Sequence, residues 1–319
     1  MNTNREQNNC SIIMLSYNTK DVTDECLTRS KRAAQYAQEQ LHAKTEIIVV
    51  DNGSTDGSPE MIRDKHPEVM LLALEKNIGY SRGNNLAMKV VSTPFVLLLN
   101  SDTYIREETL VRTIEYMETH SECGILSARL VYPDGTFQAF SGFLPTPFRT
   151  IRWAFLIESI PIVKNFIKPL YQYKKSFYKE ERVLDWASTG FFFMRREVYE
   201  KTRGFDERLF LYMEDVEWCQ RIKNAKFKIC YSPTINVVHL GGFSAKKLPS
   251  VYLLRQHLEG MRHFHSVHYP KTLRIVMFCM IVGMFLRALV YSLSMQKEKA
   301  CPYRNILKSP WLTSEMNPL

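Results

Sequence analysis

The chain has 319 residues, 45% hydrophobic and 24% charged, which is enough for one large α/β domain with an appendage or for two modest domains. Its seven cysteines are odd in number and form no Cys-x-x-Cys pair, which argues against a disulfide framework or a zinc ribbon and favours a cytosolic compartment. The net charge of +9 is concentrated in residues 143–182 and 255–319, and the polar N-terminus shows no signal segment, so nothing predicts secretion.

Short apolar runs alternate with helix-length segments through the first 130 residues. The runs predict strands at 11–17, 46–51, 69–74 and 95–100, and the segments predict helices at about 21–42, 57–66, 80–91 and 106–119. Near-continuous apolar runs are typical of strands buried on both faces. Strand–helix alternation with short connections predicts an α/β fold with a mostly parallel sheet and right-handed crossovers.

Polar clusters follow three of the predicted strands, at 17–19, 51–56 and 100–102. Each cluster alone is explained by turn and helix-cap chemistry, and Asp56 is expected to cap the helix beginning near Gly57. Ligands of a parallel sheet bind beyond the carboxyl ends of its strands, so three clusters there predict one shared polar site. G-x-G-x-x-G and G-x-x-x-x-G-K-[ST] patterns are absent, which argues against dinucleotide and P-loop sites.

Both basic stretches are also rich in aromatic and aliphatic residues. Cations beside aromatic side chains suit an anionic membrane surface, and we expect membrane contact through 143–183 and 255–299. A solvated basic face is the alternative. Nucleic acid uses similar residue types, but we expect no nucleic-acid partner.

One long apolar segment runs from Ile275 to Met295 and is interrupted only by Arg287. Its uncharged part, 275–286, would span about 18 Å as a helix, too short for a bilayer, while 275–295 would span about 30 Å with a buried arginine. Basic residues flank the segment at positions 271, 274, 297 and 299. We therefore expect a helix lying in the membrane interface, with a packed core or dimer helix and a true span as alternatives.

A series of motifs stands in order along the chain. They are SIIMLSYN (11–18), VVDNGSTDGS (49–58), NIGYSRGNN (77–85), LLLNSDT (97–103), ARLVYPDGT (128–136), DWASTGFFFMRRE (185–197), GFDERLFLYMEDVEWCQRI (204–222) and VVHLGGFS (237–244). Their order and spacing resemble the inverting family-2 glycosyltransferases with the GT-A fold, especially the rhamnosyltransferase-like branch. The resemblance implies sugar transfer from a nucleotide-diphospho-sugar to an acceptor hydroxyl, with inversion at the anomeric carbon.

The resemblance also implies a domain plan. Residues 1–250 would form the GT-A domain, with a nucleotide-sugar half at about 1–135 and an acceptor half at about 136–250. Residues 143–183 match the family poorly and would form a basic aromatic insertion in the acceptor half. Residues 251–319 would form a C-terminal basic and apolar helical region that associates with the membrane.

The metal and nucleotide sites are carried over from the family motifs. Asp102 and His239 would hold Mg²⁺ or Mn²⁺ against the sugar diphosphate, because a hard cation suits phosphate oxygens and imidazole suits Mn²⁺. Asp51 would accept a hydrogen bond from the imide N–H of uracil or thymine. The other expected nucleotide or donor contacts are Tyr17, Asn18, Asn77, Arg82, Asn100 and Ser101, with Gly79 and Gly83 allowing close backbone approach.

The catalytic candidate is Asp215 in the Glu214-Asp215 pair. Inverting transfer is a single displacement, so one carboxylate must take the acceptor proton, and Glu214 would orient the acceptor. On pattern alone, acids at a helix N-terminus are also explained by the helix dipole. Trp186, Thr189 and Gly190 match positions that contact donor sugar and acceptor. Two positions depart from the family: Trp218 is usually smaller, and Lys226 is often glycine.

Substrates and location follow from the same resemblance. It favours a dTDP-rhamnose donor, leaves UDP-linked galactose, glucose or N-acetylglucosamine open, and implies a saccharide acceptor on polyprenyl diphosphate. We expect a cytoplasmic protein, peripheral on the inner face of the cell membrane, and a possible homodimer. A sugar nucleotidyltransferase would show a Gly-rich basic first loop, which is absent here. A non-catalytic relative is disfavoured because Asp102, Asp215 and His239 occur together.

Overall fold

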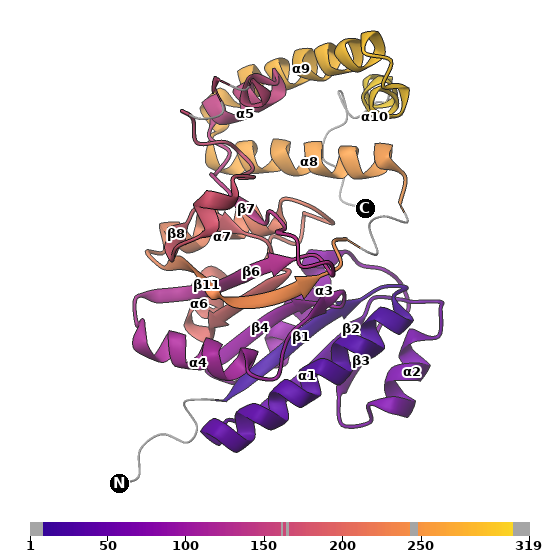
Figure 1. Ribbon diagram of the computed structural model, residues 1–319. Coiled ribbons are helices and arrows are strands. Elements are labelled where there is room, and N and C mark those ends of the chain that lie inside the picture. The colour runs from indigo at the N-terminus through magenta and orange to yellow at the C-terminus, as the bar shows by residue number, and fades with distance from the viewer. Residues whose placement is uncertain (1–8, 161, 164–165, 243–247, 309–319) are drawn as a thin grey trace.

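The computed structural model describes residues 9–160, 162–163, 166–242 and 248–308 (Figure 1). Four sequence features lie wholly or partly outside these ranges: the polar segment 1–8, residues 161, 164 and 165 of the predicted insertion, the end of the motif at 237–244, and residues 309–319 of the C-terminal region. The main sheet has the strand order β3-β2-β1-β4-β10-β6-β11-β5, with β8 paired to β11. The predicted α/β class with a mostly parallel sheet is confirmed.

The N-terminal half forms the parallel block of the sheet. Its strands are β1 (Cys10–Ser16), β2 (Thr45–Asp51), β3 (Met70–Ala73) and β4 (Phe95–Asn100), and its helices are α1 (Lys20–Leu41), α2 (Ser58–Lys65), α3 (Tyr80–Val90) and α4 (Thr109–Thr119). These are the predicted elements, with boundaries shifted by a few residues at most. The expectation that all four strands are buried on both faces is wrong for β3, an edge strand whose Met70 is 49% exposed.

The second half of the sheet contains both parallel and antiparallel strand pairs. Its strands are β5 (Thr103–Tyr104), β6 (Cys123–Val131), β8 (Arg182–Leu184), β10 (Phe191–Arg195) and β11 (Lys228–His239), and β7 (Ser141–Gly142) pairs with β9 (Trp186–Ala187) in a separate small sheet. β10 runs antiparallel to β4, so its first residues lie at the carboxyl end of β4. There the Asn100 N–H donates to the Gly190 carbonyl at 3.4 Å. Helices α6 (Arg196–Thr202) and α7 (Glu214–Asn224) complete this half.

The remaining helices form layers stacked on one side of the sheet domain (Figure 1). They are α5 (Pro147–Ala154), α8 (Ser250–His268), α9 (Leu273–Leu293) and α10 (Lys297–Leu307), with short 3₁₀ turns at Ile157–Ser159, Lys175–Tyr178 and Pro270–Thr272. Helix α8 lies between the sheet domain and the layer of α5 and α9. Part of the predicted insertion therefore packs with the C-terminal helices.

Helix α9 buries one face and leaves an apolar face exposed. On the buried face, Gly283 lets α9 approach α5 so closely that a Cβ there would lie 2.6 Å from the Ala154 carbonyl oxygen. Arg287 is 7% exposed, donates to the carbonyl oxygens of Trp153 and Ala154 at the end of α5, and stacks over the Trp153 ring. The segment Pro270–Leu293 is long and apolar enough to cross a membrane by length and composition, with a mean hydropathy of 2.2. The arginine that interrupts it points into the protein.

Candidate active site

The loops that follow β1 and β2 are tied to each other at the carboxyl edge of the sheet. Asn18 adopts a left-handed backbone conformation (φ 52°), and its Oδ1 accepts from the Thr55 N–H at 2.8 Å. Its own N–H donates to Ser54 Oγ at 2.9 Å. Asp56 joins the two helix starts, because it accepts from the N–H groups of Lys20 and Ser58, while Gly57 holds the N-cap position of α2. The predicted polar clusters thus form one connected edge.

Asp51 is fully buried at the end of β2. Its Oδ1 accepts from the Ser54 N–H at 2.8 Å, whereas Oδ2 is buried with no hydrogen-bond partner among the described residues. Burial raises the pKa of this carboxyl, with the nearby Asp56 charge adding to the shift. A buried acceptor oxygen without a donor matches the requirement of an imide N–H ligand.

The loop before α3 is held by asparagine side chains. Asn77 Oδ1 accepts from Asn52 Nδ2 and from the Gly79 N–H, both at 2.9 Å. Gly79 is left-handed (φ 92°), and a Cβ there would lie 2.7 Å from the Phe210 ring. The close approach that glycine allows at this position is therefore to another loop of the protein, and Arg82 lies half-buried in the first turn of α3.

Tyr80 lies between the donor and acceptor halves, although the sequence analysis did not single it out. Its hydroxyl is 2.8 Å from Asn100 Oδ1 and 2.9 Å from Thr189 Oγ1, which joins the ends of β4 and β9. Burial raises the pKa of the Tyr80 phenol, and the charges of Glu214, Asp215 and Asp102 raise it further. The carboxylates of the predicted metal and base sites therefore all raise the pKa of this one side chain. The only sequence signal was its place at the start of a helix within a motif.

Asp102 and His239 face each other across the ends of β4 and β11. Asp102 Oδ1 is 3.2 Å from His239 Nε2, and Nδ1 of the imidazole is 2.7 Å from Gln138 Oε1. In the neutral ring, Nδ1 donates to Gln138 and Nε2 carries a lone pair toward the carboxylate, where it makes no hydrogen bond. Two acceptors that face one another favour a cation between them. Gln138 is a second residue that motif analysis missed.

Ser101 precedes the metal candidate Asp102 in the sequence and lies beside the start of the first helix. Ser101 is buried, and its hydroxyl is 3.3 Å from Thr19 Oγ1 at the start of α1. Within the described ranges, no three His, Cys, Asp or Glu side chains gather closely enough to hold a metal ion by themselves. A cation held by Asp102 and His239 would therefore need further ligands from the substrate.

The first turn of α7 presents the two adjacent acids differently. Glu214 is 6% exposed, with Oε2 buried and unpartnered within the described part of the chain, and burial plus the Asp215 charge raise its pKa. Asp215 is half-buried, its Oδ1 accepts from the Val216 N–H at 2.8 Å, and burial raises its pKa. Glu217, one turn later, is buried and pairs with Arg221 at 2.7 Å.

Aromatic residues border the acid pair. Trp186 is buried, and its indole N–H has no hydrogen-bond partner among the residues described. Tyr171, from the basic aromatic insertion, meets Trp186 edge to face at 5.7 Å, and the Asp215 charge contributes to raising the Tyr171 pKa. At Gly190 a Cβ would lie 3.7 Å from the His239 ring, so the glycine leaves space beside the metal candidate.

Two positions depart from the family: packing accounts for Trp218, and the backbone conformation at Lys226 explains the family's preference for glycine. Trp218 is fully buried against Phe192 and Phe205, and its indole donates to Thr202 Oγ1 at 2.7 Å. Lys226 follows α7 in a left-handed conformation (φ 70°), which explains why glycine suits this position.

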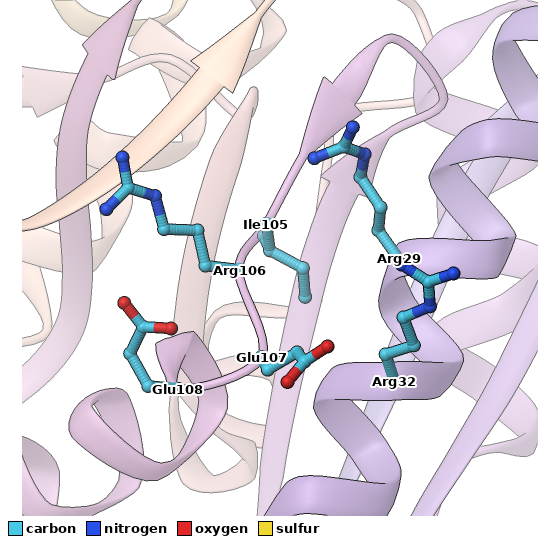
Figure 2. A pocket seen from close by; sticks show the side chains of 6 residues that line it. All are labelled: Arg29, Arg32, Ile105, Arg106, Glu107 and Glu108. Carbon is cyan, nitrogen blue, oxygen red and sulfur yellow. The ribbon is translucent and has the colours of Figure 1, made fainter.

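A pocket elsewhere on the molecule does not belong to this site. It lies between α1 and the segment before α4 (Figure 2) and is lined by Arg29, Arg32, Ile105, Arg106, Glu107 and Glu108. Its lining contains none of the predicted site residues and mixes both signs of charge. The pocket is therefore separate from the candidate site at the carboxyl edge of the sheet.

A largely parallel sheet with polar loops at its carboxyl edge is typical of α/β enzymes, and the comparisons name the family. The profile of glycosyl transferase family 2 matches residues 11–203, and the chain belongs to this family and is a glycosyltransferase.

Curated relatives include rhamnosyltransferases. N-acetylglucosaminyl-diphospho-decaprenol L-rhamnosyltransferase of Mycobacterium tuberculosis is 26% identical over 222 residues, covering 66% of this chain and 71% of the relative. The low-salt glycan biosynthesis hexosyltransferase Agl10 of Haloferax volcanii is 24% identical, covering 72% and 66%. Rhamnosyltransferase WbbL of Escherichia coli is 24% identical, covering 50% and 60%.

Solved structures support the GT-A fold. The mannosyltransferase PcManGT of Pyrobaculum calidifontis, in complex with GDP-Man and Mn²⁺, matches with a TM-score of 0.51 at 17% identity, covering 95% of this chain and 84% of that one. TarS 1–349 of S. aureus matches with a TM-score of 0.50 at 16% identity, covering 94% and 90%.

Proposed function

We propose that this glycosyltransferase is metal-dependent and inverting, and that it moves rhamnose from dTDP-rhamnose to a hydroxyl of a saccharide carried on polyprenyl diphosphate. The observation that carries the proposal is the pair of Asp102 and His239, 3.2 Å apart at the carboxyl edge of the sheet, where the Tyr80 hydroxyl also joins Asn100 to Thr189. The printed names of two relatives support rhamnose, and that of the mycobacterial relative supports a lipid-diphosphate acceptor.

Asp215 acts as the general base. Its carboxylate accepts the acceptor hydroxyl proton while the acceptor oxygen forms a bond to the anomeric carbon and the bond to the diphosphate breaks on the opposite face. The Val216 N–H holds one carboxylate oxygen in place. Burial raises the pKa of Asp215, which makes it a stronger base than an exposed aspartate while leaving it ionised in part near neutral pH.

Asp102 and His239 fit a divalent cation, because a carboxylate oxygen and an imidazole lone pair face each other at 3.2 Å. Gln138 fixes the imidazole tautomer, as outer-sphere partners of metal-bound histidines do. When bound there, Mg²⁺ or Mn²⁺ would neutralise negative charge on the departing nucleotide diphosphate. Diphosphate oxygens would complete its ligand set.

Base recognition is assigned to Asp51, whose buried Oδ2 would accept the imide N–H of thymine or uracil. Tyr17 and Asn18 would flank the nucleoside, because Asn18 belongs to the loop tied to residues 54 and 55 beside Asp51. Asn77, Arg82, Asn100 and Ser101 stay predicted donor contacts, and Trp186, Thr189, Gly190 and Glu214 stay predicted contacts of donor sugar and acceptor.

A lipid-linked acceptor implies work at a membrane surface. The exposed face of α9 is apolar, with Phe278 at 66%, Phe285 at 59% and Leu293 at 76% exposure. Lys271 and Arg274 are exposed at its N-terminal end, where they would meet anionic headgroups. We assign the protein a peripheral place on the cytoplasmic face of the cell membrane, with α9 lying in the interface.

A thermal-shift panel of dTDP, UDP and CDP, each with and without Mn²⁺, tests the base and metal assignments together. We expect dTDP and UDP to raise Tm only when Mn²⁺ is present, and Asp51→Asn to abolish the advantage of both over CDP, because cytosine has no imide N–H for the carboxylate to accept. In His239→Ala, adding Mn²⁺ should no longer increase the Tm shift that the nucleotides produce. Equal stabilisation by all three nucleotides, with or without the metal, would contradict both assignments.

A further inference from the structure

Helix α8, which belongs to the C-terminal region, packs against the loop that leads into the catalytic helix. We call residues 206–213 the pre-helix loop. At Gly260 of α8, a Cβ would lie 2.7 Å from Met213 Cβ and 2.9 Å from the Tyr212 carbonyl oxygen. Helix and loop are therefore in contact at a position where a methyl group does not fit.

The pre-helix loop ends in two consecutive left-handed residues that are not glycine. Tyr212 has φ 68° and Met213 has φ 69°, and Glu214 and Asp215 follow at once. Residues other than glycine are strained in this conformation, which persists only where the surroundings hold it. The direction in which α7 begins, and with it the place of Asp215, depends on these two residues.

Three more contacts hold this segment between α8 and the donor half. His263 of α8 places Nε2 2.8 Å from Asp206 Oδ2 and is 2% exposed. His268 places Nε2 3.2 Å from Glu217 Oε1, one turn into α7. On the other side, the Phe210 carbonyl accepts from the Tyr80 N–H at 2.8 Å.

We propose that α8 is a positioning element of the active site, in which Gly260 and His263 hold the pre-helix loop so that Asp215 meets the acceptor hydroxyl. The inference rests on the proposed role of Asp215 as the base. Neither residue touches the predicted substrate contacts, so both act through the loop. The helix that links the membrane-facing layer to the sheet domain would then also set the geometry of catalysis.

Hydrogen exchange of the full chain, followed by mass spectrometry, tests the contact without relying on activity. Gly260→Ala should speed exchange in peptides covering 206–217 and leave β1 and β2 unchanged, because the added methyl group displaces the loop. Gly283→Ala is the matched control: it places a methyl group against Ala154 in the α5–α9 contact, away from the loop. The proposal would be overturned if residues 206–217 exchanged at the wild-type rate in Gly260→Ala, or if Gly283→Ala increased their exchange rate equally.

Kinetics then separate positioning from loss of fold. Gly260→Ala should lower kcat about tenfold to a hundredfold with the donor KM unchanged, since small misplacements of a reacting group have effects of this size. Adding Met213→Gly removes the side chain that the new methyl group meets at 2.7 Å and leaves only its approach to the Tyr212 carbonyl oxygen, so the double variant should recover part of kcat. A parallel rise in donor KM in Gly260→Ala would contradict a positioning role.

A second pair of variants covers the possibility that Gly260→Ala fails to fold. His263→Gln retains a side-chain N–H for Asp206 and should keep most of kcat, whereas His263→Leu should lose as much as Gly260→Ala. Equal kinetics and equal exchange in the two variants would overturn the role of His263. If the wild type transfers no sugar, the proposed function fails, while exchange of 206–217 still decides whether α8 holds the loop.

Discussion

At the scale of single residues, the Glu214-Asp215 pair shows how neighbouring carboxyls acquire different environments. Glu214 points into the protein, with a buried oxygen that has no partner among the described residues, whereas Asp215 is half-buried and hydrogen-bonded to Val216. Burial raises both pKa values, and the Asp215 charge raises that of Glu214 further. The two environments differ in the way that the proposed roles require, with Glu214 orienting the acceptor and Asp215 taking its proton.

Asp215→Asn should lower kcat by about 10²- to 10⁴-fold, the usual contribution of a general base, with nucleotide affinity unchanged. The wild-type rate should rise with pH along an acidic limb that lies above the ordinary aspartate pKa, because burial raises that of Asp215. Transfer assays across pH, with thermal shift by dTDP and Mn²⁺ as the binding control, measure both effects. Equal transfer by variant and wild type would rule out the base assignment.

Glu214→Gln should stabilise the protein at alkaline pH. Because the folded-state pKa of Glu214 is raised, the wild type loses stability as pH rises through that pKa, and a neutral amide avoids the loss. The Tm difference between variant and wild type should be small at pH 5 and grow by pH 9, on the order of 1 kcal/mol or a few °C. A difference that does not change with pH would contradict the assigned burial effect.

At the scale of elements, helix α7 has at both ends a backbone conformation that residues other than glycine rarely adopt. It begins after two left-handed residues and ends before Lys226 at φ 70°. The Lys226 N–H donates to the Lys223 carbonyl at 3.0 Å and the Phe227 N–H to the Ile222 carbonyl at 3.2 Å, which closes the helix in the manner of a glycine terminus. A lysine there carries a steric cost.

Lys226→Gly should stabilise the fold by about 1 kcal/mol, because glycine adopts this conformation without a Cβ clash. Urea unfolding should show a higher midpoint with an unchanged m-value. Lys228→Gly, two residues later in extended β11, is the matched control and should destabilise, since glycine is disfavoured in strands. Destabilisation by both substitutions would show that Lys226 makes a contact that outweighs its backbone strain.

At the scale of the whole molecule, the helical layer presents an apolar surface that the sheet domain does not cover. The buried face of α9 packs on α5, and Arg287 on this face donates to the last carbonyl oxygens of α5. The opposite face exposes Phe278, Phe285, Leu289 and Leu293. Such a surface, with basic residues beside it, fits a helix that binds the membrane interface from one side.

Phe278→Asp combined with Phe285→Asp should weaken binding to vesicles rich in anionic phospholipid by about a hundredfold, since burial of each aromatic ring contributes about 1.5 kcal/mol or more. Flotation of protein with vesicles measures this. Val90→Asp is the control, because Val90 is 55% exposed on α3, outside the helical layer. Unchanged flotation of the double variant, or equal loss in the control, would contradict the assigned face.

The sequence by itself determined the elements of the N-terminal half and the order of the chemical motifs. Apolar runs and helical periods are local patterns, and the strands at 10–16, 45–51 and 95–100 follow from them directly. The family resemblance named Asp102 and His239, and the strand order brings their side chains to within 3.2 Å of each other. β3 was misjudged because exposure at a sheet edge depends on which strand pairs with it, which no local pattern records.

Only the tertiary structure decided how distant segments meet. The antiparallel course of β10 brings Thr189 to Tyr80, and Gln138 reaches His239 across 101 positions of the chain. In the sequence, Arg287 is a charge that interrupts an apolar helix. In the structure it donates to the carbonyl oxygen of Ala154, 133 positions earlier, and so caps the end of α5. The sequence around each of these residues does not predict its contact partner, because a side chain's surroundings are set by packing between elements.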